Sequence, residues 1–238
     1  MKIKYVVNVM NYTNKSFSLS KNISVSGNLI NYDSNTKFLF VLLHGWGADG
    51  KDLEGLVPEF LKFFPSFSFF VPNAPFNCSA NPMGFQWFEI ASSDFHANEN
   101  RDSCIEAGNY IIDLLGSLSK ELDIKFNGIF LSGFSQGGMV SLSAGIRSEK
   151  KIAGLISLSG ALLDNFDFKS ELNPPPCLIV HGSEDSIVLP EEAENAYNII
   201  NKFGNYCEKQ IIQNLGHGIN NVTINHITKF VEYVVNKK

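Results

Sequence analysis

Gly133-Phe134-Ser135-Gln136-Gly137-Gly138 is the most informative segment of the sequence. It follows the apolar run 129–131 and precedes a segment whose pattern predicts a helix. A Gly-x-Ser-x-Gly sequence at a strand-to-helix turn is typical of a serine nucleophile, because the sharp turn aims the hydroxyl out of the sheet and leaves no room for neighbouring side chains. The bare motif also occurs by chance in loops, so its setting carries the interpretation.

A serine hydroxyl becomes a strong nucleophile only when a base takes its proton and an acid orients that base. The predicted acid is Asp185, in the loop after an apolar run at 177–181. Glu184 and Asp164 are rival acids, and Asp185 also fits a helix N-cap. The predicted base is His217, which stands between two glycines. The order Ser, Asp, His along the chain is the order of the α/β-hydrolase fold.

Four other histidines compete with His217 for the role of base. His44 and His181 lie within glycine-rich loops, where we expect them to bond the backbone. His226 falls within the last helical pattern and is expected on the surface, and His96 lies in a polar loop without a supporting motif. The motif position therefore favours His217.

The oxygen of a tetrahedral intermediate needs hydrogen-bond donors that are already in place. One donor is expected from the backbone of Gln136, the residue after the serine. The other is expected from the glycine-rich loop 44–50, which follows an apolar run at 38–43, and we assign it to the backbone N–H of Trp46.

Together, these motifs resemble the carboxylesterase/phospholipase family that includes acyl-protein thioesterases; they lie at 43–50 (LHGWGADG), 133–138 (GFSQGG), 181–188 (HGSEDSIV) and 216–218 (GHG). The segments 73–76 (NAPF) and 86–88 (QWF) also resemble its bacterial members. The resemblance spans about residues 38–235. It implies a small α/β hydrolase with a minimal lid that cleaves carboxylic esters or thioesters without a cofactor. The matching site residues are Ser135, Asp185 and His217 as the triad, with the amides of Trp46 and Gln136 as the oxyanion hole.

Two features depart from the family pattern. Trp46 stands where family members usually have a smaller aliphatic residue, which would narrow or reshape the acyl site. Residues 1–36 are longer and more polar than the usual lead-in.

The loops 70–88 and 159–176 connect strand ends to later elements and are expected to wall the acyl site. Their candidate substrate-binding side chains are Phe76, Met83, Phe85, Trp87, Leu162 and Leu163. This lining favours an apolar acyl group, although the pattern favours half-exposed packing aromatics as the interpretation of the Trp46 and Trp87 side chains. The sequence leaves open the acyl length and whether the leaving group is a small alcohol, a lysophospholipid or the thiol of an acylated protein.

Six apolar runs predict strands, at 38–43, 67–71, 127–132, 153–158, 177–181 and 207–212. Most are continuous and alternate with helical patterns, which indicates an α/β fold with a mostly parallel central sheet and helices on both faces. Helical spacing is clear at 105–122 and 227–234, and at 53–64, where Pro58 should kink or restart the helix. Alternating patches near 3–9 and 23–30 predict an antiparallel pair at the sheet edge.

Length and composition predict one domain of 238 residues, with edge strands in 1–36 and a catalytic core in 37–238; 44% of the residues are hydrophobic and 18% charged. The net charge of -5 gives no reason to expect nucleic acid or a polybasic membrane contact. Four cysteines with scattered spacing favour free thiols and no metal site.

No apolar run has the length of a signal core or a membrane span, so the sequence predicts a cytoplasmic protein without a stable membrane anchor. Exposed aromatics near the site would permit a weak homodimer. Two other classes stay open: a serine peptidase or amidase on the same fold, and a non-catalytic binding protein.

Overall fold

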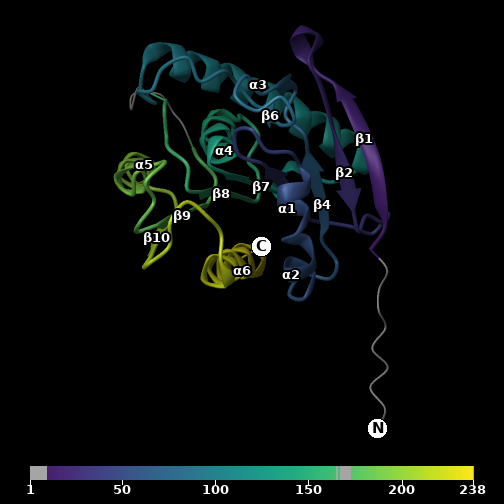
Figure 1. Cartoon of the computed structure of the whole chain (residues 1–238). Coiled ribbons are helices and arrows are strands. Elements are labelled where there is room, and N and C mark those ends of the chain that lie inside the picture. The colour runs from purple at the N-terminus through teal and green to yellow at the C-terminus, as the bar shows by residue number, and fades with distance from the viewer. Residues whose placement is uncertain (1–9, 165, 167–172, 238) are drawn as a thin grey trace.

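A computed structural model describes residues 10–164, 166 and 173–237 of the chain. Its main sheet has eight strands: β1 (Tyr12–Ser18), β2 (Ser24–Ile30), β3 (Leu39–Leu43), β4 (Ser68–Pro72), β7 (Ile129–Phe134), β8 (Gly154–Leu158), β9 (Cys177–Gly182) and β10 (Cys207–Ile212). The spatial order is β1-β2-β4-β3-β7-β8-β9-β10 (Figure 1). All neighbours from β4 to β10 are parallel, whereas β1 with β2 and β2 with β4 are antiparallel. A separate hairpin pairs β5 (Phe76–Asn77) with β6 (Phe85–Gln86).

Six α-helices cover the sheet: α1 (Lys51–Glu54), α2 (Val57–Leu61), α3 (Asn98–Leu122), α4 (Gln136–Arg147), α5 (Glu191–Asn201) and α6 (Asn221–Asn236) among the described residues. Two short 3-10 helices, η1 (Ser20–Asn22) and η2 (Phe126–Gly128), lie in connections. One face of the sheet packs against α3, α4 and α5, and the other against α1, α2 and α6 (Figure 1). The fold predicted from the alternation of strand and helix patterns is therefore confirmed.

Side chains of β3 show how one strand serves two hydrophobic cores. Val41 and Leu43 contribute to the core beneath α3 and α4, whereas Phe40 and Leu42 contribute to the core beneath α1, α2 and α6. This alternation follows from the two-residue period of a strand, and it requires an apolar residue at every position when both faces are covered. The ring of Phe40 stacks on Phe130 of β7 at a centroid distance of 5.7 Å.

All six predicted strands are present, with boundaries shifted by at most two residues and unchanged for β10. The predicted helix at 53–64 is divided into α1 and α2, and α2 begins with Pro58 in its first turn. A proline there removes only an N–H that has no partner in the helix.

The predicted edge pair is partly different from the observed one. The patch near 23–30 forms β2, but its partner is β1 at Tyr12–Ser18; the patch near 3–9 lies outside the described residues. The two outermost strands are β1 and β10. Lys15 of β1 binds Glu121 of α3 at 2.6 Å, and Lys209 of β10 binds Glu194 of α5. We propose, from the continuity of the sheet, that residues 1–238 form one domain.

Parallel strands end at a common edge of the sheet, where α/β proteins place their ligand sites. Four segments leave that edge: 44–50 after β3, 135–136 after β7, 183–190 after β9 and 213–220 after β10. These segments contain every predicted triad and oxyanion-hole residue. No helix among the described residues is long and apolar enough to cross a membrane.

Candidate active site

Ser135 lies at the turn between β7 and α4 and has a strained backbone. Its φ of 53° and ψ of -117° are unusual for a residue with a side chain. The Ser135 N–H donates to the carbonyl of Leu158 at 2.8 Å, and the Ser135 carbonyl accepts from the N–H of Met139 at 3.0 Å. Bonds on both sides hold the strained conformation, which places the serine at the N-terminus of α4.

Two glycines make this turn sterically possible. A Cβ on Gly133 would lie 2.1 Å from the carbonyl oxygen of Gly137, and one on Gly137 would lie 2.2 Å from that of Leu43. Both distances are far below contact distance, so the backbones of β3, β7 and α4 meet in this way only because these positions lack side chains.

Asp185 and His217 are in direct contact. His217 Nδ1 lies 2.8 Å from Asp185 Oδ2, so Nδ1 carries the proton and Nε2 is left to accept one. Asp185 Oδ1 accepts the N–H groups of Ile187 and Val188, each at 3.0 Å. Burial alone raises the pKa of Asp185, but the bonds from His217, Ile187 and Val188 outweigh it and lower that pKa. Asp185 is therefore an anion that orients the imidazole.

The rival acids are placed differently. Asp164 accepts hydrogen bonds from Arg147 Nε at 2.9 Å and from Ser143 Oγ at 3.0 Å, which makes it part of a buried structural cluster. Glu184 is exposed at the surface. Only Asp185 among the three contacts a histidine that is a candidate base.

The residue before the serine contacts the histidine. The ring of Phe134 lies with its centroid 4.8 Å from that of His217, and Ser135 is the next residue along the chain. Within the described part of the chain, no hydrogen bond joins the Ser135 hydroxyl to His217. Catalytic hydrogen bonds are often long before substrate binds, so this geometry is compatible with transfer of a proton to Nε2.

Two backbone N–H groups remain free near the serine. The N–H groups of Trp46 and Gln136 donate to no other group among the described residues. The loop that carries Trp46 is joined to β6, because Gly47 N–H donates to the Phe85 carbonyl at 2.9 Å and Phe85 N–H donates to the Ala48 carbonyl at 2.8 Å. This pairing fixes the backbone around the predicted oxyanion donor.

A buried hydrogen-bond network lies under the same loop. The Gln136 side chain accepts from Trp87 N–H at 2.9 Å and donates to the Phe88 carbonyl at 2.8 Å. The Trp87 indole N–H donates to the His44 carbonyl at 2.8 Å, and His44 Nε2 accepts the N–H of Ala74 at 2.9 Å. Burial lowers the pKa of His44, so its ring is neutral. The backbone bonds of His44 confirm the prediction made for it. The bonds of the Trp87 and Gln136 side chains were not predicted, because their partners are backbone groups of distant segments.

The six predicted acyl-site residues separate by exposure. Met83 and Phe76 are exposed and Phe85 is half-buried, whereas the other three, Trp87, Leu162 and Leu163, belong to the hydrophobic core. An acyl chain reaches the first group without rearrangement of the core. All six remain predictions, and the structure favours the exposed group.

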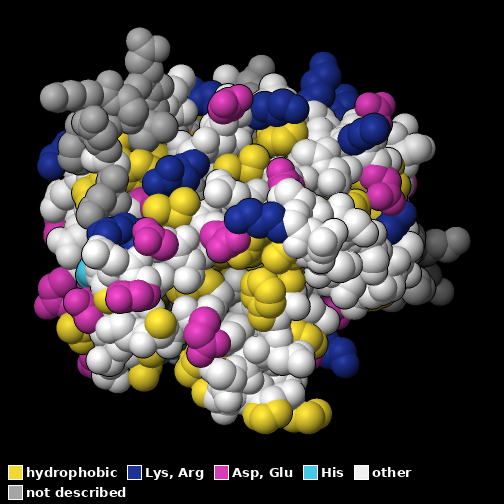
Figure 2. Space-filling view, turned by 90° about the horizontal axis from the view of Figure 1, so that it is seen from above, with side chains coloured by type: hydrophobic (Ala, Val, Ile, Leu, Met, Phe, Trp, Pro, Cys, Tyr) yellow, Lys and Arg dark blue, Asp and Glu magenta, His cyan; other side chains and the backbone are white. Residues whose placement is uncertain are grey.

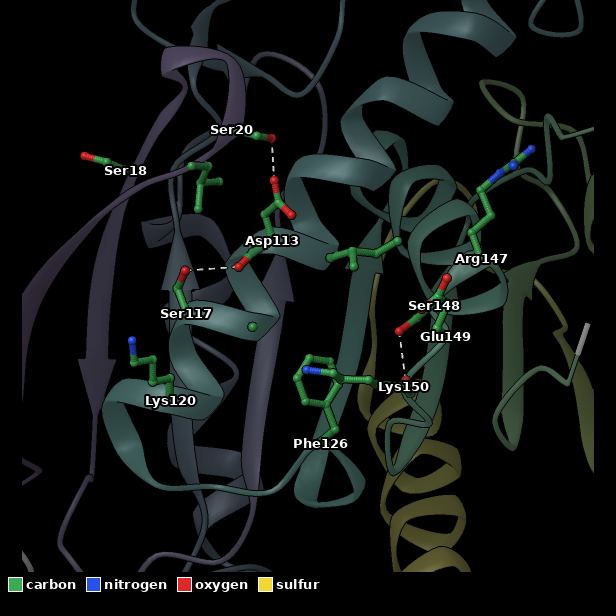
Figure 3. A pocket seen from close by; sticks show the side chains of 13 residues that line it. Ser18, Ser20, Asp113, Ser117, Lys120, Phe126, Arg147, Ser148, Glu149 and Lys150 are labelled. Atoms are coloured by element: carbon green, nitrogen blue, oxygen red, sulfur yellow. Dashed lines mark hydrogen bonds between the residues drawn. The ribbon is translucent and has the colours of Figure 1, made fainter.

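A separate cavity of about 600 Å³ lies away from these residues, between η1, α3 and the C-terminal end of α4. Figure 3 shows Asp113, Lys120 and Lys150 along its wall, with Ser20 donating to Asp113. Helix α4 has Ser135 at its N-terminus and Arg147, also at this cavity, at its last residue, so the two places are about 18 Å apart at 1.5 Å per residue. The cavity is not part of the candidate site.

Charged side chains of both signs are interspersed on the face shown in Figure 2, and neither sign forms a continuous patch there. The described residues include no group of three His, Cys, Asp or Glu side chains that could hold a metal ion. The four cysteines are free thiols, and only Cys207 is not fully buried.

Comparison with known proteins gives the family. The model of the phospholipase/carboxylesterase family matches residues 28–235. The chain belongs to this family. It is a hydrolase of the α/β-hydrolase fold, which confirms the family predicted from the four motifs.

Members of the family resemble the chain over most of its length. The carboxylesterase SOBER1 of Arabidopsis thaliana is 28% identical, covering 81% of this chain and 89% of its own. Acyl-protein thioesterase 1 of Emericella nidulans is 27% identical, covering 82% of this chain and 89% of its own. The crystal structure of esterase PE8 superposes with a TM-score of 0.79 at 27% identity, covering 94% of this chain and 99% of that one.

Proposed function

We propose that the chain is a serine hydrolase that cleaves carboxylic esters or thioesters of apolar acyl groups through a Ser135-His217-Asp185 triad. The observation that carries the proposal is the combination of a strained serine at a helix N-terminus with an imidazole bound to a buried carboxylate. The curated relatives, which are named carboxylesterases and acyl-protein thioesterases, support ester or thioester substrates.

The proposed reaction has two halves. His217 Nε2 takes the proton of the Ser135 hydroxyl as its oxygen attacks the acyl carbonyl, and the amides of Trp46 and Gln136 bind the resulting oxyanion. The tetrahedral intermediate collapses, the alcohol or thiol leaves with the proton from His217, and an acyl-enzyme remains. Water then attacks the acyl-enzyme by the same sequence and releases the carboxylic acid and the free serine.

The apolar acyl group is supported by the exposed side chains near the hairpin of β5 and β6. Phe76 and Met83 expose hydrophobic surface. Trp46, in the loop 44–50 that carries the proposed oxyanion donor (the oxyanion loop), is also exposed. The indole N–H of Trp46 donates to Gln86 Oε1 at 2.8 Å, which holds the ring in one orientation. We propose that these side chains contact the acyl group of a small ester, a lysophospholipid or an acylated protein. Cytoplasmic location and weak homodimerisation remain predictions.

Replacing Ser135 with alanine tests the proposal. We expect turnover of p-nitrophenyl esters to fall by about 10⁴- to 10⁶-fold, because the nucleophile is lost while the fold is retained. Labelling by a fluorophosphonate probe should disappear in parallel, and circular dichroism should be unchanged.

A variant that keeps most of its esterase activity would show that Ser135 is not the nucleophile. Cleavage of peptide or amide substrates in preference to esters and thioesters would indicate a serine peptidase or amidase. A wild-type protein that neither cleaves these substrates nor reacts with the probe would indicate a binding protein.

A further inference from the structure

His181 is a buried imidazole that the proposed reaction does not use. It is the penultimate residue of β9 and is 1% exposed. Its Nε2 lies 2.8 Å from the carbonyl oxygen of Val188. Because a carbonyl oxygen only accepts, Nε2 carries the proton and donates it to Val188. Asp185 Oδ2 lies 3.3 Å from the same nitrogen, beside this N–H.

Val188 connects His181 to the acid in a second way. The Val188 carbonyl accepts from His181, while the Val188 N–H donates to Asp185 Oδ1 at 3.0 Å. The other oxygen of Asp185 accepts from His217 Nδ1 at 2.8 Å. A continuous series of contacts therefore runs from β9 to the proposed base through the loop 183–190, which carries Asp185 and is called the acid loop here.

The other ring nitrogen of His181, Nδ1, makes no comparable contact among the described residues. Within the described part of the chain, Nδ1 of His181 is buried and has no hydrogen-bond partner. A buried polar atom without a partner destabilises the fold, and leucine or phenylalanine would avoid that cost. The contacts of Nε2 therefore account for a histidine at this position. The same contacts exclude His181 as the base, because Nε2 is engaged and Nδ1 is enclosed.

We propose that His181 is a positioning residue with two effects. It fixes the acid loop through Val188, and it weakens the electrostatic stabilisation that Asp185 gives to the protonated ring of His217. This inference rests on the proposed triad. The N–H group of His181 lies beside Asp185 Oδ2, the oxygen that binds His217, with Nε2 at 3.3 Å, and its partial positive charge offsets part of the negative charge of that oxygen. A carboxylate with less free charge stabilises the protonated imidazole less.

Few other titratable groups face this cluster. The acid loop also contains Glu184, whose side chain is exposed, and α5 begins with Glu191 and Glu192. Glu192 binds His96 at 3.0 Å, away from Asp185. The segments 133–138 and 213–220, which carry the serine and the base, contain no titratable side chain besides His217.

Removing the Nε2 donor should have two effects. The loop that carries Asp185 loses its side-chain bond from His181, so kcat falls while KM stays nearly constant. The negative charge at Oδ2 also becomes more available to His217, which favours the protonated, inactive imidazole. The midpoint of the acid limb in the kcat/KM profile therefore moves to higher pH.

Three substitutions separate this role from simple packing. His181→Phe removes both ring nitrogens. The amide nitrogen of His181→Gln reaches the place of Nε2, whereas that of His181→Asn reaches only the place of Nδ1. The control is Ser141→Ala in α4, which removes another buried polar atom without a partner in the described structure.

We expect the Phe and Asn variants to lose about tenfold in kcat, with an acid limb displaced upward by about 0.5 pH unit. The kcat of the Gln variant should stay within about threefold of the wild-type value. The Ser141→Ala variant should have the kcat and the acid limb of the wild type. Fluorophosphonate titration counts folded sites in each preparation, and if the Phe variant does not fold, the Gln and Asn pair provides the comparison.

An unmoved acid limb in the Asn variant, or equal losses in the Gln and Asn variants, would overturn the role of His181. Activity that survives replacement of Ser135 would instead overturn the proposed function, so the two failures are distinguishable.

Discussion

At the scale of single residues, the candidate site depends on how one carboxylate is held. Asp185 is buried and accepts hydrogen bonds from two backbone amides and one imidazole. These donors lower its pKa against the effect of burial. An aspartate whose pKa is lower in the folded chain than in the unfolded chain stabilises the fold above the unfolded value of about 3.9. That contribution is lost as the pH falls through the folded pKa.

Asp185→Asn should therefore change the pH dependence of stability. Asparagine does not titrate, so the difference in unfolding free energy between wild type and variant should be smaller at pH 3 than at pH 6. Urea denaturation at both pH values measures it, with Glu184→Gln at the exposed neighbouring position as the control. A difference that is equal at both pH values would mean that Asp185 keeps its ordinary pKa in the folded chain.

Individual residues were predictable from sequence where a short motif specifies them. The predicted contact between Asp185 and His217 is present, because each residue stands in a loop that leaves the same edge of the sheet after its own strand. His181 bonds the backbone as predicted, but its contact with Asp185 was not predictable. The role of Trp87 was not predictable either, since its indole donates to the backbone of His44. No spacing in a sequence marks a bond to a carbonyl in another loop.

At the scale of elements, the segment after β6 braces the oxyanion loop. Trp87 was predicted to line the acyl site, but its indole N–H is bound to the carbonyl of His44 and its backbone to Gln136. The brace therefore joins three segments, the loop after β3, the segment after β6 and the turn that begins α4. Its position in the core is what a structural role requires.

Trp87→Phe distinguishes a structural role for Trp87 from direct contact with the acyl group of the substrate. Loss of the indole N–H leaves the buried His44 carbonyl without its donor, so the free energy of unfolding should fall by about 1–3 kcal/mol. The ratio of kcat/KM values for short and long p-nitrophenyl esters should be unchanged. A shifted chain-length preference would place Trp87 in the acyl site, and Met83→Ala, at an exposed predicted contact, provides the comparison for such a shift.

Strands covered on both faces were predictable, and most exposed elements were not. The five strands β3, β4, β7, β8 and β9 are mainly apolar runs, which is why periodicity and length located them within two residues. The outermost strand β10 was also located, although it carries Glu208, Lys209 and Gln210. β1 carries Asn14, Lys15 and Ser16 in its middle, so no apolar pattern marks it. The hairpin of β5 and β6 has two residues in each strand and depends on its contact with the oxyanion loop.

At the scale of the whole molecule, stability depends on two cores on opposite faces of the sheet. The core beneath α1, α2 and α6 is rich in phenylalanine. Phe130 of β7 is fully buried within it, and its ring centroid lies 5.7 Å from that of Phe40 and 6.0 Å from that of Phe67. β7 also leads into the turn with Ser135, so this core supports the strand that ends at the proposed nucleophile.

Phe130→Ala should reduce the free energy of unfolding by about 3–5 kcal/mol, because it leaves a cavity between well-packed rings. Phe63→Ala, at a position that is 48% exposed, is the matched control and should change it by less than about 0.5 kcal/mol. Chemical denaturation of both variants measures the difference. Similar losses at the two positions would contradict the assignment of Phe130 to the core.

The lysines on the outermost strands have a consequence for how copies of the chain meet. An exposed strand edge invites another chain to add to the sheet, and a charged lysine on such a strand opposes that addition. Lys15 and Lys209 are each anchored to a glutamate on a helix, one at either rim. A second molecule that docked there would have to bury a fixed ammonium group. We therefore expect the two lysines to oppose growth of the sheet into fibres by addition of strands at β1 or β10.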